Sequence, residues 1–308
     1  MNRRLFLAAS ASAAASPLAT PLHAQDKPDW GGPVLDIHIH PKGPGGEWLH
    51  MEGSGVSHAL LLTRAGAESE AHAREEMAKH PGRFQFSVAL DPARPETLAS
   101  LRRAVKEGAK GFGEMKSPAK ADGPEMMRVY ELAAELAAPV TIHFADFPQF
   151  PGDTSYNEGI TRFEAVLKKF PKVTFIGHAD GFWANISAEV PPVAYPTGPI
   201  KPGGISDKLL RDYPNLYADM SANSCRNALA RDEQFIRGFL IRHQDKLMFG
   251  SDCSCRDGRG AGQRSDQPLI KGRCVARETL TALKSLAAPG VFRKIAWSNG
   301  ARLLGYRA

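Results

Sequence analysis

The stretch VLDIHIH at residues 34–40 decides the fold. An apolar run rich in β-branched residues ends in two histidines one residue apart, His38 and His40. Side chains alternate between the two faces of a β-strand, so both imidazoles are expected on one face, with Asp36 deeper on the same face. A buried strand that ends in two imidazoles aimed at one point predicts a site at its C-terminal end.

Similar strand patterns recur along the whole chain. Seven more apolar runs follow, at 58–63, 84–90, 109–115, 139–144, 173–178, 215–221 and 246–252. Amphipathic helical patterns occupy 68–80, 95–108, 124–137, 158–170, 205–212, 231–243, 276–287 and 290–304. Only the first crossover, 41–57, lacks a clear helical pattern.

This alternation of buried strands with helices predicts a parallel sheet covered by helices. Eight such units over about 250 residues predict an α/β fold of the (β/α)8 or TIM-barrel type, in a single domain. The alternative is a doubly wound open sheet. That fold usually has a glycine-rich phosphate turn after its first strand, whereas this chain continues with HPKGPGG.

The first 24 residues differ in character from the rest. They carry the pair Arg3-Arg4, then a small and apolar stretch rich in Ala and Ser, and they end in Leu22-His23-Ala24. The apolar part is too short for a spanning helix. The pattern predicts a twin-arginine export signal over residues 1–24, followed by the barrel domain over 25–308. We therefore expect a periplasmic or secreted protein.

Charge and composition favour a small-molecule substrate. Without the expected signal, 37 basic and 33 acidic residues leave a net charge of +4, which is too weak to indicate nucleic acid or a membrane surface. No later stretch approaches the length of a transmembrane helix. The oligomeric state stays open, a homo-oligomer included.

Polar side chains gather where the expected strands end. They are His38, His40, Glu114, His143, His178 and Asp252. Strand ends form one ring in a barrel, so these residues should converge on one pocket. Imidazoles and carboxylates crowded in a poorly solvated cup are costly without compensation, which a divalent cation supplies. Zinc is the expected ion, with iron and manganese as alternatives, and a catalytic site leaves one position for water.

The order of these motifs resembles the amidohydrolase superfamily of metal-dependent barrels. The resemblance rests on the DxHxH strand, the strand-end residues His143 and His178, and FGSD with Asp252. The short spacing of the elements and the closing IAWSNGARLLGY (295–306) look more like the amidohydrolase-related branch. The resemblance covers roughly residues 33 to 306.

The resemblance implies a role for each residue. His38, His40 and Asp252 would bind the metal, with His143 as the next ligand, and Asp252 would also take a proton from the reacting water. His178 would bind a second metal or polarise the substrate. Glu114 resembles a carboxylate that bridges two metals in some members, and Lys116 competes with it because other members use a carboxylated lysine nearby. One or two ions are therefore expected.

Some polar residues have a structural interpretation. Asp36 lies deeper on the strand and is interpreted as a support for the ligands. Asp219 in the seventh strand is left outside the predicted site. Five further histidines fall in expected loops or helices and are interpreted as ordinary, namely His50, His58, His72, His80 and His243.

The connection at 253–275 combines cysteines with basic residues. An oxidising compartment permits disulfides, and we expect one from Cys253 or Cys255 to Cys274 or Cys225. A thiolate metal ligand is less favoured, because one residue of a Cys-x-Cys pair faces away if the strand continues. Arginines at 256, 259, 264 and 273 could receive an anionic substrate group, although a solvated loop explains them slightly better.

Three functions are consistent with the sequence. The first is an exported metal-dependent hydrolase that attacks an ester, lactone, amide or similar bond, with Asp252 and His178 as catalytic residues. The second is a metal-dependent decarboxylase or hydratase, a lyase acting on a small aromatic or unsaturated carboxylic acid. The third is a metal-free binding protein on a barrel scaffold.

Overall fold

The computed structural model describes residues 27–149 and 152–307, so the expected export signal lies outside the described residues. One sheet of eight parallel strands runs in sequence order. The strands are β1 (Leu35–Ile39), β2 (His58–Arg64), β3 (Phe84–Ala89), β4 (Phe112–Met115), β5 (Val140–His143), β6 (Phe175–His178), β7 (Leu216–Met220) and β8 (Leu247–Phe249).

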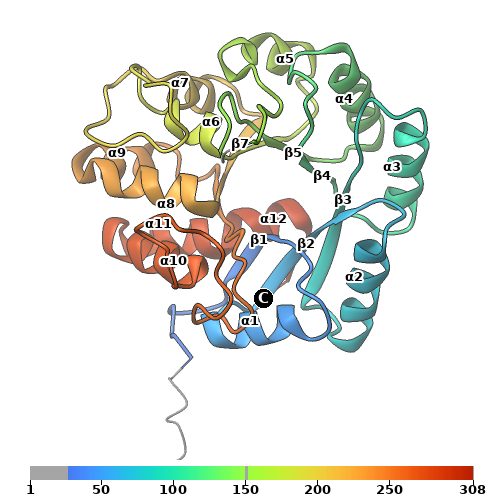
Figure 1. Ribbon diagram of the computed structural model, residues 1–308, viewed down its shortest axis with the longest axis horizontal. Helices are drawn as coiled ribbons and strands as arrows, with labels where there is room; N and C mark the ends of the chain where they lie inside the picture. Colours follow the sequence, from blue (N-terminus) through green and yellow to red (C-terminus); the bar gives the residue numbers. More distant parts are fainter. Residues whose placement is uncertain (1–26, 150–151, 308) are drawn as a thin grey trace, which may run out of the picture.

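The sheet curls into a nearly closed barrel (Figure 1). The backbone just after β8 returns to β1, where the N–H of Asp252 donates to the carbonyl oxygen of His38 at 2.8 Å. The N–H of Ser251 donates to Oδ1 of Asp36, also at 2.8 Å. The predicted single-domain (β/α)8 barrel is therefore confirmed, and the backbone after the last strand meets the first strand at Asp36 and His38.

Helices surround the strands (Figure 1). They are α1 (Gly46–Ser54), α2 (Glu68–Lys79), α3 (Thr97–Lys106), α4 (Pro124–Leu136), η1 (Ile160–Arg162), α5 (Glu164–Lys169), α6 (Asp180–Ala184), α7 (Ile205–Asp212), α8 (Ala222–Arg231), α9 (Glu233–Arg242), α10 (Val275–Leu286), α11 (Pro289–Arg293), the π-helical turn η2 (Lys294–Ser298) and α12 (Asn299–Leu304). No helix among the described residues is long and apolar enough to span a membrane.

Local sequence explains where several helices begin and end. Pro124 starts α4, where its fixed φ suits the first helical position and its missing N–H leaves nothing unpaired. The Asp232 carboxylate caps α9 by accepting from the N–H of Phe235 at 3.0 Å. Gly305 ends α12 with φ 73°, a left-handed conformation that glycine adopts without strain.

Three helices differ from the sequence prediction. The first crossover does contain a helix, α1, whose buried side includes Glu47, His50 and Ser54. A polar buried face produces no apolar period, which is why the pattern was missed. The short helix α6 and the helix α8 were also not predicted, and both begin directly after a strand that carries site residues, β6 and β7 respectively.

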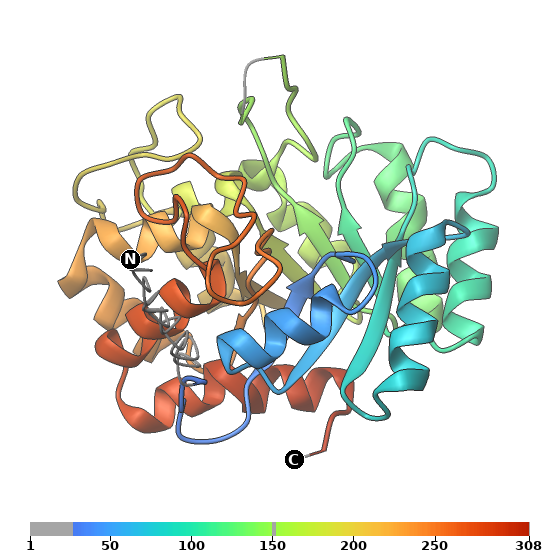
Figure 2. The same ribbon diagram turned by 60° about the horizontal axis from the view of Figure 1, so that its bottom comes forward.

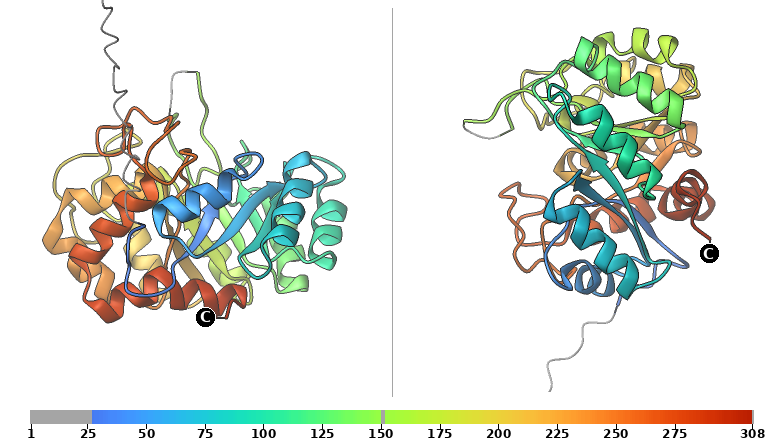
Figure 3. Two further views of the ribbon diagram at one scale, coloured as in Figure 1. Left: turned by 90° about the horizontal axis from the view of Figure 1, so that it is seen from below. Right: turned by 90° about the vertical axis from the view of Figure 1, so that its right-hand side faces the viewer.

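The long connections and the chain end lie on opposite sides of the barrel (Figures 2 and 3). The segments that follow β5, β6 and β8 rise on one side, whereas α12 crosses the other side next to the C-terminus. A small apolar cluster joins α12 to strand residues, among them Leu35, Ile37, Leu60, Leu62, Ile176 and Met248. That end of the barrel is therefore filled, and the C-terminal strand ends are left for a site.

Candidate active site

All six residues predicted from the strand ends come together at one end of the barrel. His38 is inside β1, Glu114 inside β4, and His143 and His178 are the last residues of β5 and β6. The other two lie just beyond their strands, His40 one residue after β1 and Asp252 three residues after β8. Residues more than 200 positions apart in the sequence therefore face one another.

The Glu114 carboxylate lies between two sets of histidines. Its Oε2 is 3.3 Å from Nε2 of His40 and 4.0 Å from Nε2 of His38. Its Oε1 contacts Nδ1 of His143 and lies 3.2 Å from Nε2 of His178. Each oxygen thus faces a different pair of imidazoles, which is the arrangement of a carboxylate that can bridge two cations.

Asp252 faces the first of these sets from the other side. Its Oδ1 lies 3.6 Å from Nε2 of His40 and 3.9 Å from Nε2 of His38. Its side chain is 31 % exposed, whereas those of His38 and His178 are fully buried. Asp252 adopts φ 46°, an unusual conformation for a residue with a side chain. The carboxylate therefore reaches both the imidazoles and the space where a substrate would bind.

Asp219, which the sequence prediction left out, belongs to the site. Its Oδ2 lies 2.5 Å from Nδ1 of His38 and 3.3 Å from Nδ1 of His178. The hydroxyl of Ser221 also lies 2.8 Å from Nδ1 of His178. These contacts hold Nδ1 of each imidazole ring. The other ring nitrogen, Nε2, therefore points toward Glu114. An acid between Ala218 and Met220 in the interior of the seventh strand is the signal that points to it.

The glycine of FGSD is explained by the same contacts. A Cβ added to Gly250 would lie 2.3 Å from Oδ1 of Asp219 and 2.9 Å from Cβ of His38. Such distances are far inside van der Waals contact, so any larger residue would displace the Asp219–His38 pair.

Asp36 supports the strand, as predicted, because its carboxylate accepts from the N–H groups of His38 and Ser251.

The electrostatics of the site favour bound positive charge. Burial opposes ionisation of Glu114, yet the neighbouring imidazoles, chiefly His143, hold its pKa well below its usual range. Burial likewise disfavours the charged form of His178, but the Asp219 and Glu114 carboxylates prevail and raise its pKa to about 10. Burial, which disfavours the charged carboxylate, raises the pKa of Asp36 to about 7, although hydrogen bonds from His38 and Ser251 oppose the rise. Glu114 and Asp219 therefore hold negative charge in a buried site, and a positive charge, whether on an imidazole or on a bound cation, stabilises them.

The residues fit a metal centre. Nε2 of His38, of His143 and of His178 is buried and has no hydrogen-bond partner within residues 27–149 and 152–307. Three sets of donor atoms are close enough to share an ion, namely His38/His40/Glu114, Glu114/His143/His178 and His38/His178/Asp252. Imidazole nitrogen with carboxylate oxygen is the donor set that zinc, iron and manganese accept.

A cavity of about 270 Å³ opens above these donors. Besides His40, Glu114, His143, His178 and Asp252, its lining includes Lys116, Gln149, Tyr195, Asn223, Ser254, Gln263, Arg264 and Ile270. Nζ of Lys116 lies 4.6 Å from the centre of the Tyr156 ring, so Glu114 and not Lys116 stands between the histidines. The connection after β8 supplies much of the wall, and Tyr195 comes from the connection after β6.

Expectations about the connection after β8 and about His50 are wrong. No disulfide joins the four cysteines, all of which belong to the described part of the chain. His50 is not an ordinary helical histidine, because it lies beside Cys253, Cys255 and Cys274. The expectation that one residue of Cys-x-Cys faces away assumed a continuing strand, but β8 ends at Phe249 and both thiols point to the same place.

Solved structures of other proteins share this fold. Dihydroorotase from Campylobacter jejuni superposes with a TM-score of 0.58 at 14% identity, covering 90% of this chain and 84% of its own. A TatD homologue from Escherichia coli K12 gives 0.55 at 14%, covering 89% and 98%. The 2,6-dihydroxybenzoate decarboxylase from Rhizobium gives 0.51 at 17%, covering 88% and 98%. At these identities the likeness concerns the fold alone.

Sequence comparison identifies the family. No curated protein matches the chain. Residues 42–306, however, match the family described as Amidohydrolase, a range that begins two residues after His40 and includes the four other strand-end residues of the site. The matched range spans most of the barrel. Members of this family are metal-dependent enzymes that act on small molecules. The chain therefore belongs to the amidohydrolase superfamily, and specifically to the family that this match defines.

Proposed function

We propose that this protein is an exported metal-dependent hydrolase that adds water across an ester, lactone, amide or similar bond of a small molecule. The observation that carries the proposal is the position of Asp252. Its carboxylate lies 3.6 Å from Nε2 of His40 and is partly exposed to the cavity, where a general base must stand. Family membership supports a metal-dependent reaction and leaves the bond that is cleaved as our proposal.

Two zinc ions would occupy the site, one on each side of Glu114. His38, His40 and Asp252 would hold the first with Oε2 of Glu114, and His143 and His178 would hold the second with Oε1. The buried nitrogens without partners support this assignment. When bound, the ions would polarise the scissile carbonyl and lower the pKa of a water molecule toward neutrality.

The protein's own residues would then move protons and orient the substrate. Asp252 would accept a proton from the attacking water and return it to the leaving group. His178 is fixed by Asp219 and Ser221, so its Nε2 can hold an ion or stabilise charge that develops on the substrate without first reorienting. Lys116 and Arg264 line the same cavity and suit an anionic group on the substrate.

A second candidate function is a lyase that removes carbon dioxide from, or adds water to, a small aromatic or unsaturated acid. The positions of Lys116 and Arg264 at the cavity wall favour this lyase, because their positive charges would hold a substrate carboxylate beside the metal ligands. The decarboxylase from Rhizobium shares the fold. The reactions differ in the fate of water. Hydrolysis puts solvent oxygen into a product and splits the substrate in two, hydration adds solvent oxygen without splitting the substrate, and decarboxylation releases carbon dioxide without adding solvent oxygen.

The test is a substrate panel assayed in oxygen-18 water with the metal-loaded enzyme. Esters, lactones, amides and aromatic acids would be compared, with carbon dioxide release measured in parallel. Turnover with one solvent oxygen incorporated per bond cleaved supports the hydrolase. Carbon dioxide release without solvent oxygen in the organic product would replace it with the decarboxylase. Protein that holds less than half an equivalent of transition metal, prepared without chelators, would contradict both.

Export by the twin-arginine route is also our proposal, and it rests on the sequence of residues 1–24 alone. The route carries folded proteins, which suits an enzyme that must take up metal before export. Fusion of residues 1–30 to a folded reporter should deliver the reporter to the periplasm. The double variant Arg3→Lys/Arg4→Lys should keep it in the cytoplasm. Equal export of both fusions would contradict the twin-arginine assignment.

A further inference from the structure

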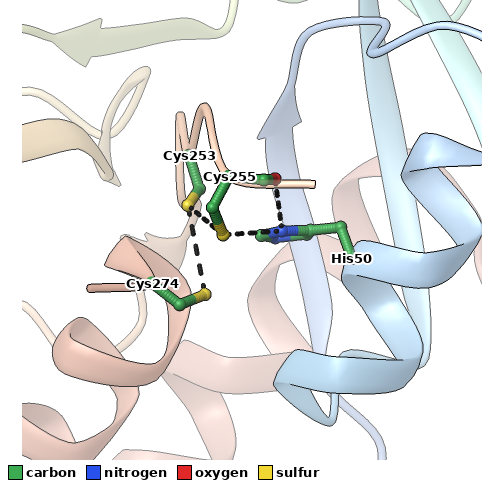
Figure 4. A group of neighbouring side chains, drawn as sticks. All are labelled: His50, Cys253, Cys255 and Cys274. Atoms are coloured by element: carbon green, nitrogen blue, oxygen red, sulfur yellow. Dashed lines mark hydrogen bonds between the residues drawn. The ribbon is translucent and has the colours of Figure 1, made fainter. Parts of the chain in front are cut away.

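Figure 4 shows a second group of side chains that can bind a metal ion, namely His50, Cys253, Cys255 and Cys274. It shares no residue with the active site. His50 comes from α1, Cys253 and Cys255 come from the connection after β8, and Cys274 immediately precedes α10. All four are buried, and one donor atom from each lies within 4.8 Å of the others. Three segments that are distant in the sequence therefore bring three thiols and one imidazole to a single point.

Two separations between donor atoms match the edges of a tetrahedron. With Zn–S of about 2.3 Å and Zn–N of about 2.0–2.1 Å, tetrahedral zinc separates two sulfurs by about 3.8 Å and a sulfur from a nitrogen by about 3.5 Å. Sγ of Cys253 lies 3.9 Å from Sγ of Cys274, and Sγ of Cys255 lies 3.5 Å from Nδ1 of His50. The Cys253–Cys255 pair, whose sulfurs lie 3.1 Å apart, would have to open, and all donor atoms already lie within 4.8 Å of one another.

The surroundings of Cys253 suit a thiolate. Its sulfur accepts from the N–H of Val275 at 3.3 Å and from Nε2 of Gln263 at 3.6 Å. Nζ of Lys42 donates to the carbonyl oxygen of Cys253 and places a positive charge nearby. Donors directed at a sulfur are the supporting contacts that metal-bound thiolates receive.

Two glycines allow the two backbones to approach closely enough for this cluster. A Cβ on Gly53 would lie 1.7 Å from the carbonyl oxygen of Asp257, and a Cβ on Gly258 would lie 2.2 Å from the carbonyl oxygen of His50. Helix α1 and the connection after β8 are therefore in direct backbone contact. Nε of Arg277, at the start of α10, donates to the carbonyl oxygen of Gly53 at 2.9 Å and adds the third segment.

The alternative is a cluster of buried groups that hydrogen-bond only to one another. Nδ1 of His50 lies 3.2 Å from the Cys255 carbonyl oxygen and could donate there. Thiols, however, are weak donors and weak acceptors, and three of them gathered around one imidazole would satisfy one another poorly. Two of the cysteines could also form a disulfide, which would leave the third thiol and the imidazole without a shared partner.

We propose that His50, Cys253, Cys255 and Cys274 bind one structural Zn²⁺ ion. The site is closed, because four protein donors complete a tetrahedron and burial leaves no position for water or substrate. The ion would tie the connection at 253–275 to α1 and α10. That connection contributes Ser254, Gln263, Arg264, Ser265 and Ile270 to the cavity wall, and it begins directly after Asp252. The zinc site would thus hold one wall of the active-site cavity in place.

Cobalt substitution separates this site from the active site. The strand-end donors offer only nitrogen and oxygen, so a near-ultraviolet thiolate-to-cobalt charge-transfer band can arise only at the cysteines. Wild-type protein loaded with Co²⁺ should show this band, and Cys274→Ser should lose most of it together with one equivalent of metal per chain. Cys225→Ser is the matched control, since Cys225 is buried outside the cluster and its replacement should leave the band and the metal content unchanged.

Thiol mapping of the wild type keeps the test decisive where Cys274→Ser does not fold. Metal-bound protein should resist alkylation at all three cluster cysteines, and removal of the metal by a chelator should expose them. A disulfide between any two of them in protein purified from its own compartment would overturn the proposal. Absence of the charge-transfer band in folded, cobalt-loaded wild type would also overturn it. Copper instead of zinc bound to the thiolates in the purified protein would do the same. These readouts do not depend on which reaction the enzyme catalyses.

Discussion

The carboxylate of Asp219 lies 2.5 Å from Nδ1 of His38, on the side of the ring that faces away from Glu114 and Asp252. This contact fixes the ring and leaves Nε2 as the nitrogen that points into the site. The same carboxylate lies 3.3 Å from Nδ1 of His178. One buried acid from β7 therefore orients imidazoles from β1 and β6, and the geometry of the site depends on a residue that does not itself line the cavity.

Replacement of Asp219 by asparagine should weaken metal binding. The amide keeps the size of the side chain but loses the charge that orients both imidazoles and raises their basicity, so metal affinity should fall about 10–100-fold. Competition with a chelator of known affinity measures it. The control is Asp207→Asn, because Asp207 forms a similar buried pair with His243 at 2.6 Å, away from the cavity. Equal metal affinity in the Asp219 variant and the wild type would contradict the role of Asp219.

The position of Glu114 predicts a change in metal stoichiometry. Glu114→Gln removes the negative charge that faces both pairs of histidines, so a protein that holds two active-site ions should retain at most one tightly. Elemental analysis after dialysis measures the content, with the structural zinc site counted separately by its thiolate signal. Glu76→Gln is the control, since Glu76 is a buried carboxylate on α2 that pairs with Lys79. An unchanged metal content in Glu114→Gln would argue against a bridging role.

Much of the fold and the site follows from sequence because strand ends converge in a barrel. His38, His143, His178 and Asp252 could be placed in one pocket without coordinates, since the strand pattern fixes which end of each strand they occupy. Asp219 was missed because a single acid inside a strand does not reveal which face it takes. Helix α1 was missed because its buried face carries Glu47 and His50, which give no apolar period.

The cysteine cluster was beyond sequence reasoning for a different reason. Its donors come from α1, from the connection after β8 and from the start of α10, and only the packing of Gly53 against Asp257 brings the first two together. Spacing along the chain carries no information about such a contact. The expectation for the Cys-x-Cys pair also assumed a continuing strand. The strand β8, however, ends four residues before Cys253.

Asp252 should be required for turnover rather than for folding. Asp252→Asn retains the shape of the side chain but cannot accept a proton, so kcat should fall about 10²–10⁴-fold, the range that general base catalysis contributes. Far-ultraviolet circular dichroism and the thermal midpoint should stay close to the wild type. Asp266→Asn serves as the control, because Asp266 lies in the same connection and its side chain is 90 % exposed. An active Asp252→Asn enzyme would rule out the proposed base.

Arg264 should control affinity for anionic substrates. Its side chain lines the cavity, and its N–H donates to Oγ of Ser254 at 2.9 Å, which anchors the backbone. Arg264→Met keeps the aliphatic stem and removes the charge. We expect KM for a carboxylate-bearing substrate to rise about tenfold or more while kcat changes little, which corresponds to the 1.5–3 kcal/mol of a hydrogen bond to a charged group. Arg273→Met is the control, since Arg273 is largely exposed and pairs with Glu278. Equal KM values would indicate that Arg264 stays solvated.

His58 should make folding stability depend on pH. The ring packs against Trp297 and Tyr306, and burial together with the nearby Arg83 lowers its pKa to about 4 from the ordinary value of 6.5. The unfolded chain therefore binds a proton at a higher pH than the folded chain does. Neutral His58 therefore contributes to the free energy of unfolding. This contribution is complete above pH 6.5 and is lost as the pH falls from 6.5 toward 4.

The measurement compares urea unfolding of the wild type with His58→Gln at pH 7 and pH 5. The wild type should lose on the order of 1–2 kcal/mol more unfolding free energy over this interval than the variant, which has no group to protonate at position 58. Other titrating groups are common to both proteins, so their contributions cancel in the difference. Parallel losses in the two proteins would mean that His58 takes up its proton equally readily in the folded and unfolded chains.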